Sequence, residues 1–275
     1  MNYRVTLIIG LLLIVFKSFG QFNTPTIDGA IGTNEYGNHT IGANKGTSGS
    51  VDWYCTWDDT CAYFAIDSGF NASGGDALNV YLDIDPAIIS NAGTGLDTGA
   101  TYDNVTPNMV INADAFLYVK DNYEDRNIVS SSSWVSHSSA VSKITAFVNT
   151  TTNTIEMRVR WDSLGVSARP SRFNWFGFIS YNGGGGGCFG QMPSANGNGN
   201  TPDMPRYLKI ENTDSAALEK PFSKECYTHL GNSVYNFGPI DIYDFTMNSP
   251  GDSILRTAGD WSIEGNLYVE SGVVD

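Results

Sequence analysis

The stretch from Val51 to Pro86 constrains the fold more than any other part of the chain. From Val51 to Trp57 every second residue is apolar, Asp58-Asp59 favours a turn, and the aromatic-rich run Cys61–Asp67 follows. This period of two predicts a β-hairpin. The next run, Ala77–Asp85, predicts a third strand whose apolar face carries Leu78, Val80, Leu82 and Ile84. We therefore expect three consecutive antiparallel strands with one buried face.

Further alternating runs continue along the chain, each bounded by turn-forming residues. They are Ala113–Lys120, Val141–Asn149, Thr154–Trp161, Phe173–Tyr181, Arg206–Glu211 and Val234–Thr246. Helical periodicity is absent apart from a short turn at Asp162–Gly165. Short strands separated by turns predict an all-β fold, an antiparallel two-sheet β-sandwich of jelly-roll-like type.

The first 20 residues are typical of a secretory signal peptide. Arg4 precedes an apolar run from Val5 to Phe16, and the small residues Ser18 and Gly20 precede an expected cleavage point near Gln21. A single membrane anchor is the alternative, but the run is shorter than the roughly 20 residues that span a bilayer. We expect a secreted or extracellular protein, associated with the cell surface, with no membrane insertion after cleavage.

The charge of the mature chain excludes two classes of partner. Without Arg4 and Lys17, 13 basic side chains remain against 29 acidic ones, a formal charge of −16. Nucleic acids and anionic membranes are bound through Lys and Arg, so neither is an expected partner.

The domain organisation follows from the remaining length. Residues 21–250 are expected to form the β-sandwich. Residues 251–275 contain two short alternating runs around Glu264-Gly265-Asn266. These C-terminal strands either close the sandwich or begin a further β module.

Four cysteines in an exported chain predict two disulfides. Cys55 and Cys61 flank the hairpin turn, which favours a Cys55–Cys61 bridge and leaves Cys188 with Cys226. Zinc is the competing hypothesis, but the chain has no Cys-x-x-Cys pair. Its histidines, His39, His137 and His229, are isolated in the sequence.

Several motifs in a fixed order resemble a known family. These are IDGAIGTNEYG, VDWYCTWDDTCAYFAI, ALNVYLDIDP and IEMRVRWDSLG, and the resemblance that they carry extends over about Pro25–Leu208. The order resembles the sandwich of family 9 carbohydrate-binding modules and DOMON-type domains, close to the domains at the front of large secreted bacterial surface proteins. The resemblance implies a sugar-binding or ligand-binding sandwich, often with structural calcium. The usual C-terminal sorting region of such proteins is not seen, so we expect a partial product of a longer protein.

Sugar binding requires exposed aromatic faces beside amide and carboxylate groups. Trp53 and Trp57 fall on the apolar face of their strand, so we expect them in the core. The candidate residues for binding a polysaccharide or glycan are Trp134, Trp175, Tyr181 and Asn182. For each, packing against the sheet is the alternative.

Calcium is the expected cofactor. The acidic strand and the glycine-rich loop after it carry Asp83, Asp85, Asp97 and Asp103. Calcium takes six to eight oxygen ligands, which such a loop can supply. A solvated acidic face is the alternative.

Catalysis is not expected, although paired carboxylates occur. Asp58/Asp59, Asp83/Asp85 and Glu124/Asp125 could serve glycoside hydrolysis only if two carboxyl groups faced each other across a cleft. The sequence favours a non-catalytic carbohydrate-binding domain. The alternative is a structural or adhesive extracellular domain that binds a protein or no small ligand, and a glycoside-active enzyme ranks third.

Overall fold

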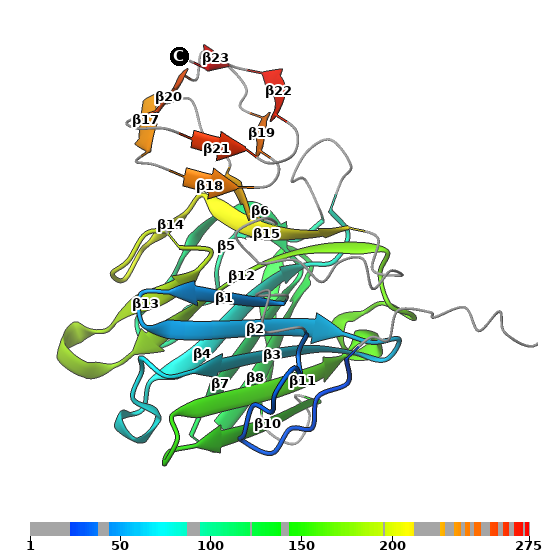
Figure 1. The fold of residues 1–275 in the computed structure, drawn as a ribbon. Helices are drawn as coiled ribbons and strands as arrows, with labels where there is room; N and C mark the ends of the chain where they lie inside the picture. Colours follow the sequence, from blue (N-terminus) through cyan, green and yellow to red (C-terminus); the bar gives the residue numbers. More distant parts are fainter. Residues whose placement is uncertain are drawn as a thin grey trace, which may run out of the picture.

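The computed structural model describes residues 23–37, 44–86, 94–121, 123–138, 143–194 and 196–211, together with the backbone of short strands between residues 226 and 274. The predicted signal peptide lies outside these ranges. Within them the chain forms strands and short 3₁₀ turns (Figure 1). No helix in the described ranges is long and apolar enough to cross a bilayer.

The first sheet has five antiparallel strands in the order β1-β2-β3-β11-β10. The predicted hairpin is confirmed: β2 and β3 pair with Cys55 opposite Phe64. The strands are β1 (Lys45–Ser48), β2 (Val51–Trp57), β3 (Cys61–Asp67), β10 (Ile144–Asn149) and β11 (Thr154–Arg160).

The second sheet has eight strands in the order β16-β15-β12-β4-β7-β8-β9, and β13 pairs with β12. All of its pairings are antiparallel. We did not predict β8, β9, β13 or β16 from the sequence, because none of these strands shows a regular alternation of apolar residues. The strands are β4 (Ala77–Asp83), β7 (Ala115–Lys120), β8 (Tyr123–Ser130), β9 (Ser133–Ser138), β12 (Arg172–Tyr181), β13 (Gly187–Met192), β15 (Arg206–Glu211) and β16 (Cys226–Thr228).

The main core lies between these two sheets, so the predicted antiparallel two-sheet sandwich is confirmed. Trp53 and Trp57 are buried in it, as their positions on the apolar face predicted. The Trp53 ring packs against Trp175 from the opposite sheet, with 6.2 Å between ring centroids. Gly177 lies under this contact, because a Cβ atom there would meet the Trp53 ring at 2.6 Å.

A second core covers the outer face of the eight-stranded sheet. Tyr81 stacks between Phe116 and Phe176, with centroid distances of 4.4 and 5.1 Å. A small three-stranded sheet contributes to the same cluster through residues such as Met109, Ile111 and Met204. Its strands are β5 (Leu96–Thr98), β6 (Asn108–Ala113) and β14 (Asp203–Met204).

A buried carboxylate helps to attach the N-terminal segment to the first sheet. Glu156 of β11 accepts hydrogen bonds from the Tyr36 hydroxyl at 2.9 Å and from the backbone amides of Gly29 at 2.6 Å and Asp28 at 3.2 Å. Burial raises the pKa of Glu156, although these donors act in the opposite sense. The backbone of the Ile-Asp-Gly motif and the side chain of Tyr36 therefore donate hydrogen bonds to the same carboxylate.

Neither predicted disulfide is found among the residues that the structure describes. Cys55, Cys61 and Cys188 are free thiols. Cys55 faces the main core, whereas Cys61 packs with Tyr36 and Tyr63 on the other face of the same sheet. Alternation along the hairpin therefore separates the two sulfurs. The side chain of Cys226 lies outside the described residues.

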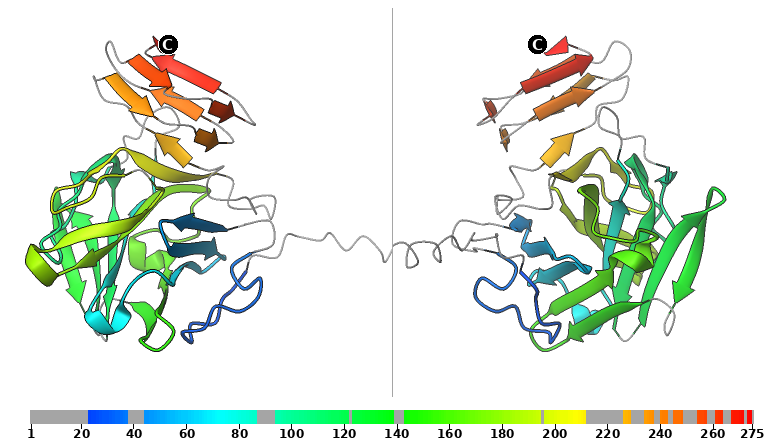
Figure 2. Two further views of the ribbon diagram at one scale, coloured as in Figure 1. Left: turned by 60° about the vertical axis from the view of Figure 1, so that its left-hand side comes forward. Right: turned by 90° about the vertical axis from the view of Figure 1, so that its right-hand side faces the viewer.

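The C-terminal strands pair in parallel, which the alternating pattern did not predict. Val234 pairs with Ile254 and Ile254 with Val273, a repeat of about 20 residues of the kind that stacked coils show. Two further parallel pairs have the same spacing, and the three small sheets lie beyond β15 (Figures 1 and 2). The strands are β17 (Val234–Phe237), β18 (Ile240–Ile242), β19 (Phe245–Asn248), β20 (Ile254–Thr257), β21 (Trp261–Ile263), β22 (Leu267–Ser271) and β23 (Val273–Val274). The parallel segment begins at Val234, within the range that we assigned to the sandwich.

The Glu156 contact can be tested by removing one donor. We expect Tyr36→Phe to lower the free energy of unfolding by about 1–3 kcal/mol, because a buried carboxylate loses a hydrogen bond. Urea denaturation measures the change. Tyr181→Phe, on an exposed ring, is the matched control and should change stability by less than about 0.5 kcal/mol. Equal effects of the two substitutions would contradict this role for Glu156.

Candidate functional site

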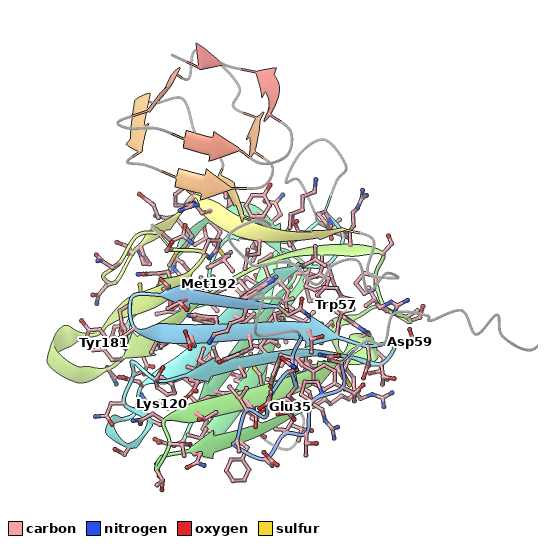
Figure 3. All side chains as sticks on the ribbon, viewed as in Figure 1. Glu35, Trp57, Asp59, Lys120, Tyr181 and Met192 are labelled. Carbon is pink, nitrogen blue, oxygen red and sulfur yellow. The ribbon has the colours of Figure 1, made fainter. Side chains whose placement is uncertain are left out.

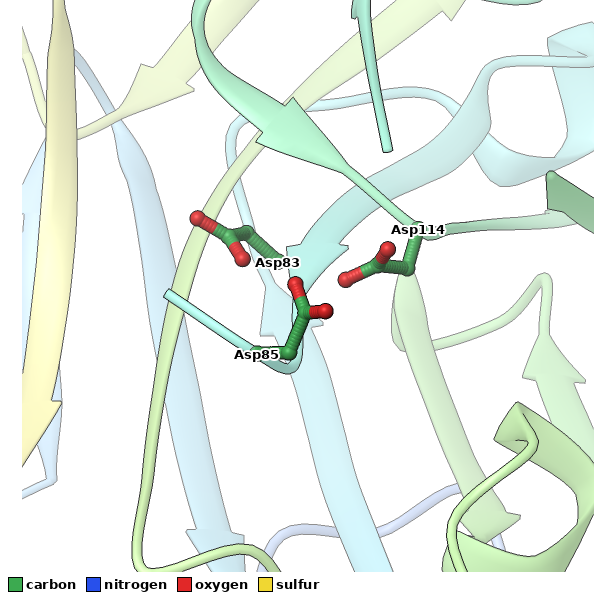
Figure 4. Close-up of side chains that lie close together, drawn as sticks. All are labelled: Asp83, Asp85 and Asp114. Carbon is green, nitrogen blue, oxygen red and sulfur yellow. The ribbon is translucent and has the colours of Figure 1, made fainter. Parts of the chain in front are cut away.

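Three carboxylates meet at one end of the eight-stranded sheet. Asp83 ends β4, Asp85 lies in the turn that follows, and Asp114 lies between β6 and β7 (Figure 4). One oxygen from each lies within 4.8 Å of the others. The pairing of Leu82 with Ala115 places Asp83 and Asp114 beside each other.

Neighbouring groups donate hydrogen bonds to some of these carboxylate oxygens, whereas other oxygens receive no hydrogen bond. The Thr94 hydroxyl donates to Asp85 at 2.9 Å and to Asp114 at 3.3 Å, and the Ile84 amide donates to Asp114 at 2.8 Å. The Asn174 amide group donates to one oxygen of Asp83 at 3.2 Å. The other oxygen of Asp83 and the carbonyl oxygen of Asn174 are buried without a hydrogen-bond partner. Such orphaned acceptors are costly, and a cation bound at the cluster would satisfy the carboxylate of Asp83.

The electrostatics of this cluster favour protonation when no cation is present. Burial, and next the charge of Asp114, raises the pKa of Asp83 to about 8. Burial, with a smaller contribution from Asp85, raises the pKa of Asp114 to about 6. A bound cation would lower both pKa values, because it stabilises the ionised carboxylates.

Only half of the predicted calcium set comes together. Asp83 and Asp85 belong to the cluster, whereas Asp97 is exposed on β5. Asp103 lies elsewhere, where its carboxylate accepts from Tyr118, Lys120 and Ser180 at 2.8–2.9 Å. Asp114 was missed. Its signal was an acidic residue inside an apolar run, which we assigned to the strand instead of to the turn between β6 and β7.

The structure separates the two predicted tryptophans and places one of them in the core. The prediction that Trp175 is a surface ring is wrong, because this residue is fully buried against Trp53 and Phe64. Trp134 is half-buried on β9, and its indole nitrogen donates to the carbonyl of Thr98 at 2.8 Å. Trp134 therefore holds β5 against the outer face of the sheet.

Tyr181 and Asn182, by contrast, are exposed together where β12 ends. The Tyr181 ring packs beside Phe189, with centroids 6.0 Å apart, and the residue as a whole is 37% exposed. The amide of Asn104 donates to the Asn182 side-chain oxygen at 3.1 Å. Residues 183–187, all glycine, follow at once.

An ion pair lies at this same end of the eight-stranded sheet. Lys120, at the end of β7, contacts Asp103 at 2.9 Å, and Ser180 donates to the same carboxylate. Asp103 adjoins Asn104 in sequence and so links the ion pair to Asn182. In Figure 3, Tyr181 and Lys120 lie at the same side of the molecule. We call Tyr181, Asn182, Asn104, Asp103 and Lys120 the glycine-loop patch.

Comparisons with known proteins find limited similarity. No family model matches the chain, and no curated protein matches it. A family 9 carbohydrate-binding module from Caldicellulosiruptor kristjanssonii in complex with glucose is 12% identical, with a TM-score of 0.31, over 58% of this chain and 75% of that one. The same kind of module in complex with cellotriose gives 12%, 0.32, 58% and 73%. Both come from the family that the motif order resembles. These values are too low to transfer residues or a ligand to this chain.

The raised pKa values predict how stability depends on pH in the presence of a chelator. A group whose pKa is raised on folding binds more protons in the native state, so its contribution is lost as pH rises. For Asp83 the loss runs from about pH 4 to about pH 8. We therefore expect the melting temperature in EDTA to fall between about pH 5 and about pH 8.

The control is a pair of neutralising substitutions. Asp83→Asn should flatten this dependence and stabilise the protein at the alkaline end. Asp97→Asn, at an exposed position, should leave the dependence as it is. A melting temperature that rises with pH over the same range would contradict the assignment.

Proposed function

We propose that this chain is an extracellular, non-catalytic carbohydrate-binding module and that the glycine-loop patch contacts the sugar. The single observation that carries this proposal is the joint exposure of Tyr181 and Asn182. An exposed aromatic face can stack on the apolar face of a pyranose, while side-chain amides hydrogen-bond its hydroxyl groups. Asn182 and Asn104 supply these amides beside the ring.

The charge of the chain narrows the ligand class. A mature chain of formal charge −16 repels anionic polymers. The ion pair between Lys120 and Asp103 leaves no net charge in the patch itself. The proposed ligand is therefore a neutral polysaccharide or glycan. An open site of this kind typically binds at μM to mM concentrations, or roughly −4 to −8 kcal/mol.

We further propose that calcium binds at Asp83, Asp85 and Asp114. The orphaned oxygens of Asp83 and Asn174 support this proposal, because calcium takes oxygen ligands and tolerates irregular geometry. The cation would stabilise the turn after β4 and the junction between β6 and β7. It would act on the fold and not in the sugar contact, since the cluster shares no residue with the glycine-loop patch.

The positions of the acidic residues do not favour glycoside hydrolysis as the function. Asp83, Asp85 and Asp114 are closer together than the roughly 5–10 Å that separates catalytic carboxyl groups. Asp58 is committed to the hairpin turn, where it accepts from the amides of Thr60 and Cys61 at 2.7 Å. Asp59 forms an ion pair with Arg169.

Sugar binding is tested with residues 21–275 on a glycan array and in pull-downs with insoluble polysaccharides. We expect Tyr181→Ala to weaken binding by about tenfold or more, because the stacking surface is lost. Phe147→Ala removes another exposed ring, on β10, and is the matched control. A folded protein that binds no glycan would instead favour the structural or adhesive alternative. Equal losses in both variants would contradict the assigned patch.

Calcium binding is tested by thermal unfolding at about pH 8, where Asp114 is ionised and Asp83 is about half ionised before the cation binds. Calcium at a hundredfold excess over its dissociation constant should add about 2.7 kcal/mol of stability, and EDTA should remove it. Asp114→Asn should abolish the effect, and Asp97→Asn should retain it. Loss of the effect in Asp97→Asn alone would place the ion elsewhere.

A further inference from the structure

The glycine-loop patch contains a dipeptide with chemistry of its own. The chain has three Asn-Gly pairs: Asn182-Gly183, Asn196-Gly197 and Asn198-Gly199. In an Asn-Gly pair the glycine amide nitrogen can attack the side-chain carbonyl carbon of the asparagine, because glycine has no side chain to obstruct the approach. Whether a given pair reacts depends on how far the fold restrains both groups.

In the pair Asn196-Gly197 the fold restrains both the asparagine side chain and the glycine amide. The Asn196 side chain donates to the carbonyls of Pro193 and Arg206 and accepts from the Arg206 amide at 2.9 Å. The Gly197 amide donates to the carbonyl of Asp203 at 2.7 Å. The side-chain carbonyl of Asn196 is held in place and the Gly197 amide already donates a hydrogen bond. This pair is therefore protected from the attack of the glycine nitrogen on the side chain.

At Asn198-Gly199 the nucleophile is also occupied. The backbone of Gly199 is hydrogen-bonded to the Cys188 thiol, which is buried. Asn198 itself is exposed. Reaction at this pair requires that the Cys188 contact break first.

Asn182-Gly183 differs from both. Asn182 is exposed, and a Cβ atom added to Gly183 would meet nothing within 4 Å. Within the described residues the Gly183 amide donates no hydrogen bond, whereas the Gly183 carbonyl accepts from Gly186. The nucleophile is therefore free and the space around it is open.

The carbonyl of Asn182 is also polarised. The Asn104 amide donates to the Asn182 Oδ1 atom at 3.1 Å. A donor at this oxygen stabilises the negative charge that develops there when the carbonyl carbon is attacked. Asn196 has a comparable donor, since its Oδ1 atom accepts from the Arg206 amide at 2.9 Å, so the selectivity for Asn182 rests on the free Gly183 nitrogen and the open space around it.

We propose that Asn182 is a site of spontaneous deamidation, selective over the other two Asn-Gly pairs. The Gly183 nitrogen bonds to Cγ of Asn182 and loses its proton, the Cγ–Nδ2 bond breaks, and ammonia leaves, which forms a five-membered succinimide. Water then opens the ring and yields aspartate or isoaspartate. No oxidation or reduction occurs, and water is the only co-reactant.

The consequence for binding rests on the proposed function. Deamidation replaces a neutral amide with a carboxylate close to Asp103 and removes a hydrogen-bond donor from the patch. Isoaspartate also lengthens the backbone ahead of the glycine run. Both changes are expected to weaken sugar binding as the protein ages.

The experiment incubates the intact protein in mildly alkaline buffer and follows each Asn-Gly pair by peptide mapping with mass spectrometry. Asn182 should convert at least about tenfold faster than Asn196, a barrier difference of about 1.4 kcal/mol. Asn104→Ala and Gly183→Ala should each slow conversion at Asn182 and leave Asn196 unchanged. Thermal unfolding of each variant confirms that it is folded.

Conversion of Asn196 or Asn198 at the rate of Asn182 would overturn the proposal, as would an undiminished rate in Asn104→Ala. The mapping needs no sugar, so its outcome is independent of the proposed function. If Asn182 converts selectively while the fresh protein binds no glycan, the modification site stands and the binding role fails.

Discussion

The constraint on which the rest of the structure depends is that the central strands of the eight-stranded sheet are buried on both faces. Every residue of β4 is buried, and β7 and β12 are buried along almost their whole length. Their inner faces form the main core with the five-stranded sheet. Their outer faces carry a row of aromatic rings that must also be covered, because exposed apolar area of this size is unfavourable in water. The segment that covers them determines which polar residues meet.

That covering segment runs from about residue 94 to residue 114 and positions both candidate sites. Tyr81 anchors it by donating to the carbonyl of Ala100 at 3.0 Å. Further along, Asp103 and Asn104 reach the end of β12, where the glycine-loop patch forms. Thr94 and Asp114 lie at the two ends of the segment and complete the acidic cluster at the end of β4. One packing requirement thus explains two separate groupings of polar side chains.

The two groups of acidic residues differ in how their charge is balanced. Asp103 accepts three hydrogen bonds, one of them from the ammonium group of Lys120, so its charge is compensated within the protein. Asp83 and Asp114 lie beside each other and have raised pKa values. Their mutual repulsion is the kind that a divalent cation relieves. From the sequence we assigned Asp83 and Asp103 to one set because they lie on the acidic strand and on the loop after it.

The sequence predicted whether a side chain is buried or exposed where this depends only on the residue's own strand or turn. Alternation placed Trp53 and Trp57 in the core, and the end of β12 with its glycine run placed Tyr181 and Asn182 at the surface. The same reasoning failed for Trp175. We chose Trp175 because its strand leads towards the glycine run, whereas its side chain faces the main core and only its neighbour Asn174 lies on the opposite face, buried beside Asp83.

The sequence by itself determined the strand class, the hairpin and the main buried face, because side-chain alternation is a local property of each strand. Only the tertiary structure decided which distant segments meet. Asp114 joins Asp83 through the pairing of β4 with β7, and Cys55 is separated from Cys61 by the two faces of one sheet. The parallel pairing of β17 with β20 likewise depends on a repeat across about 20 residues. The physical reason is that pairing between strands is chosen by burial over the whole domain, which no single strand encodes.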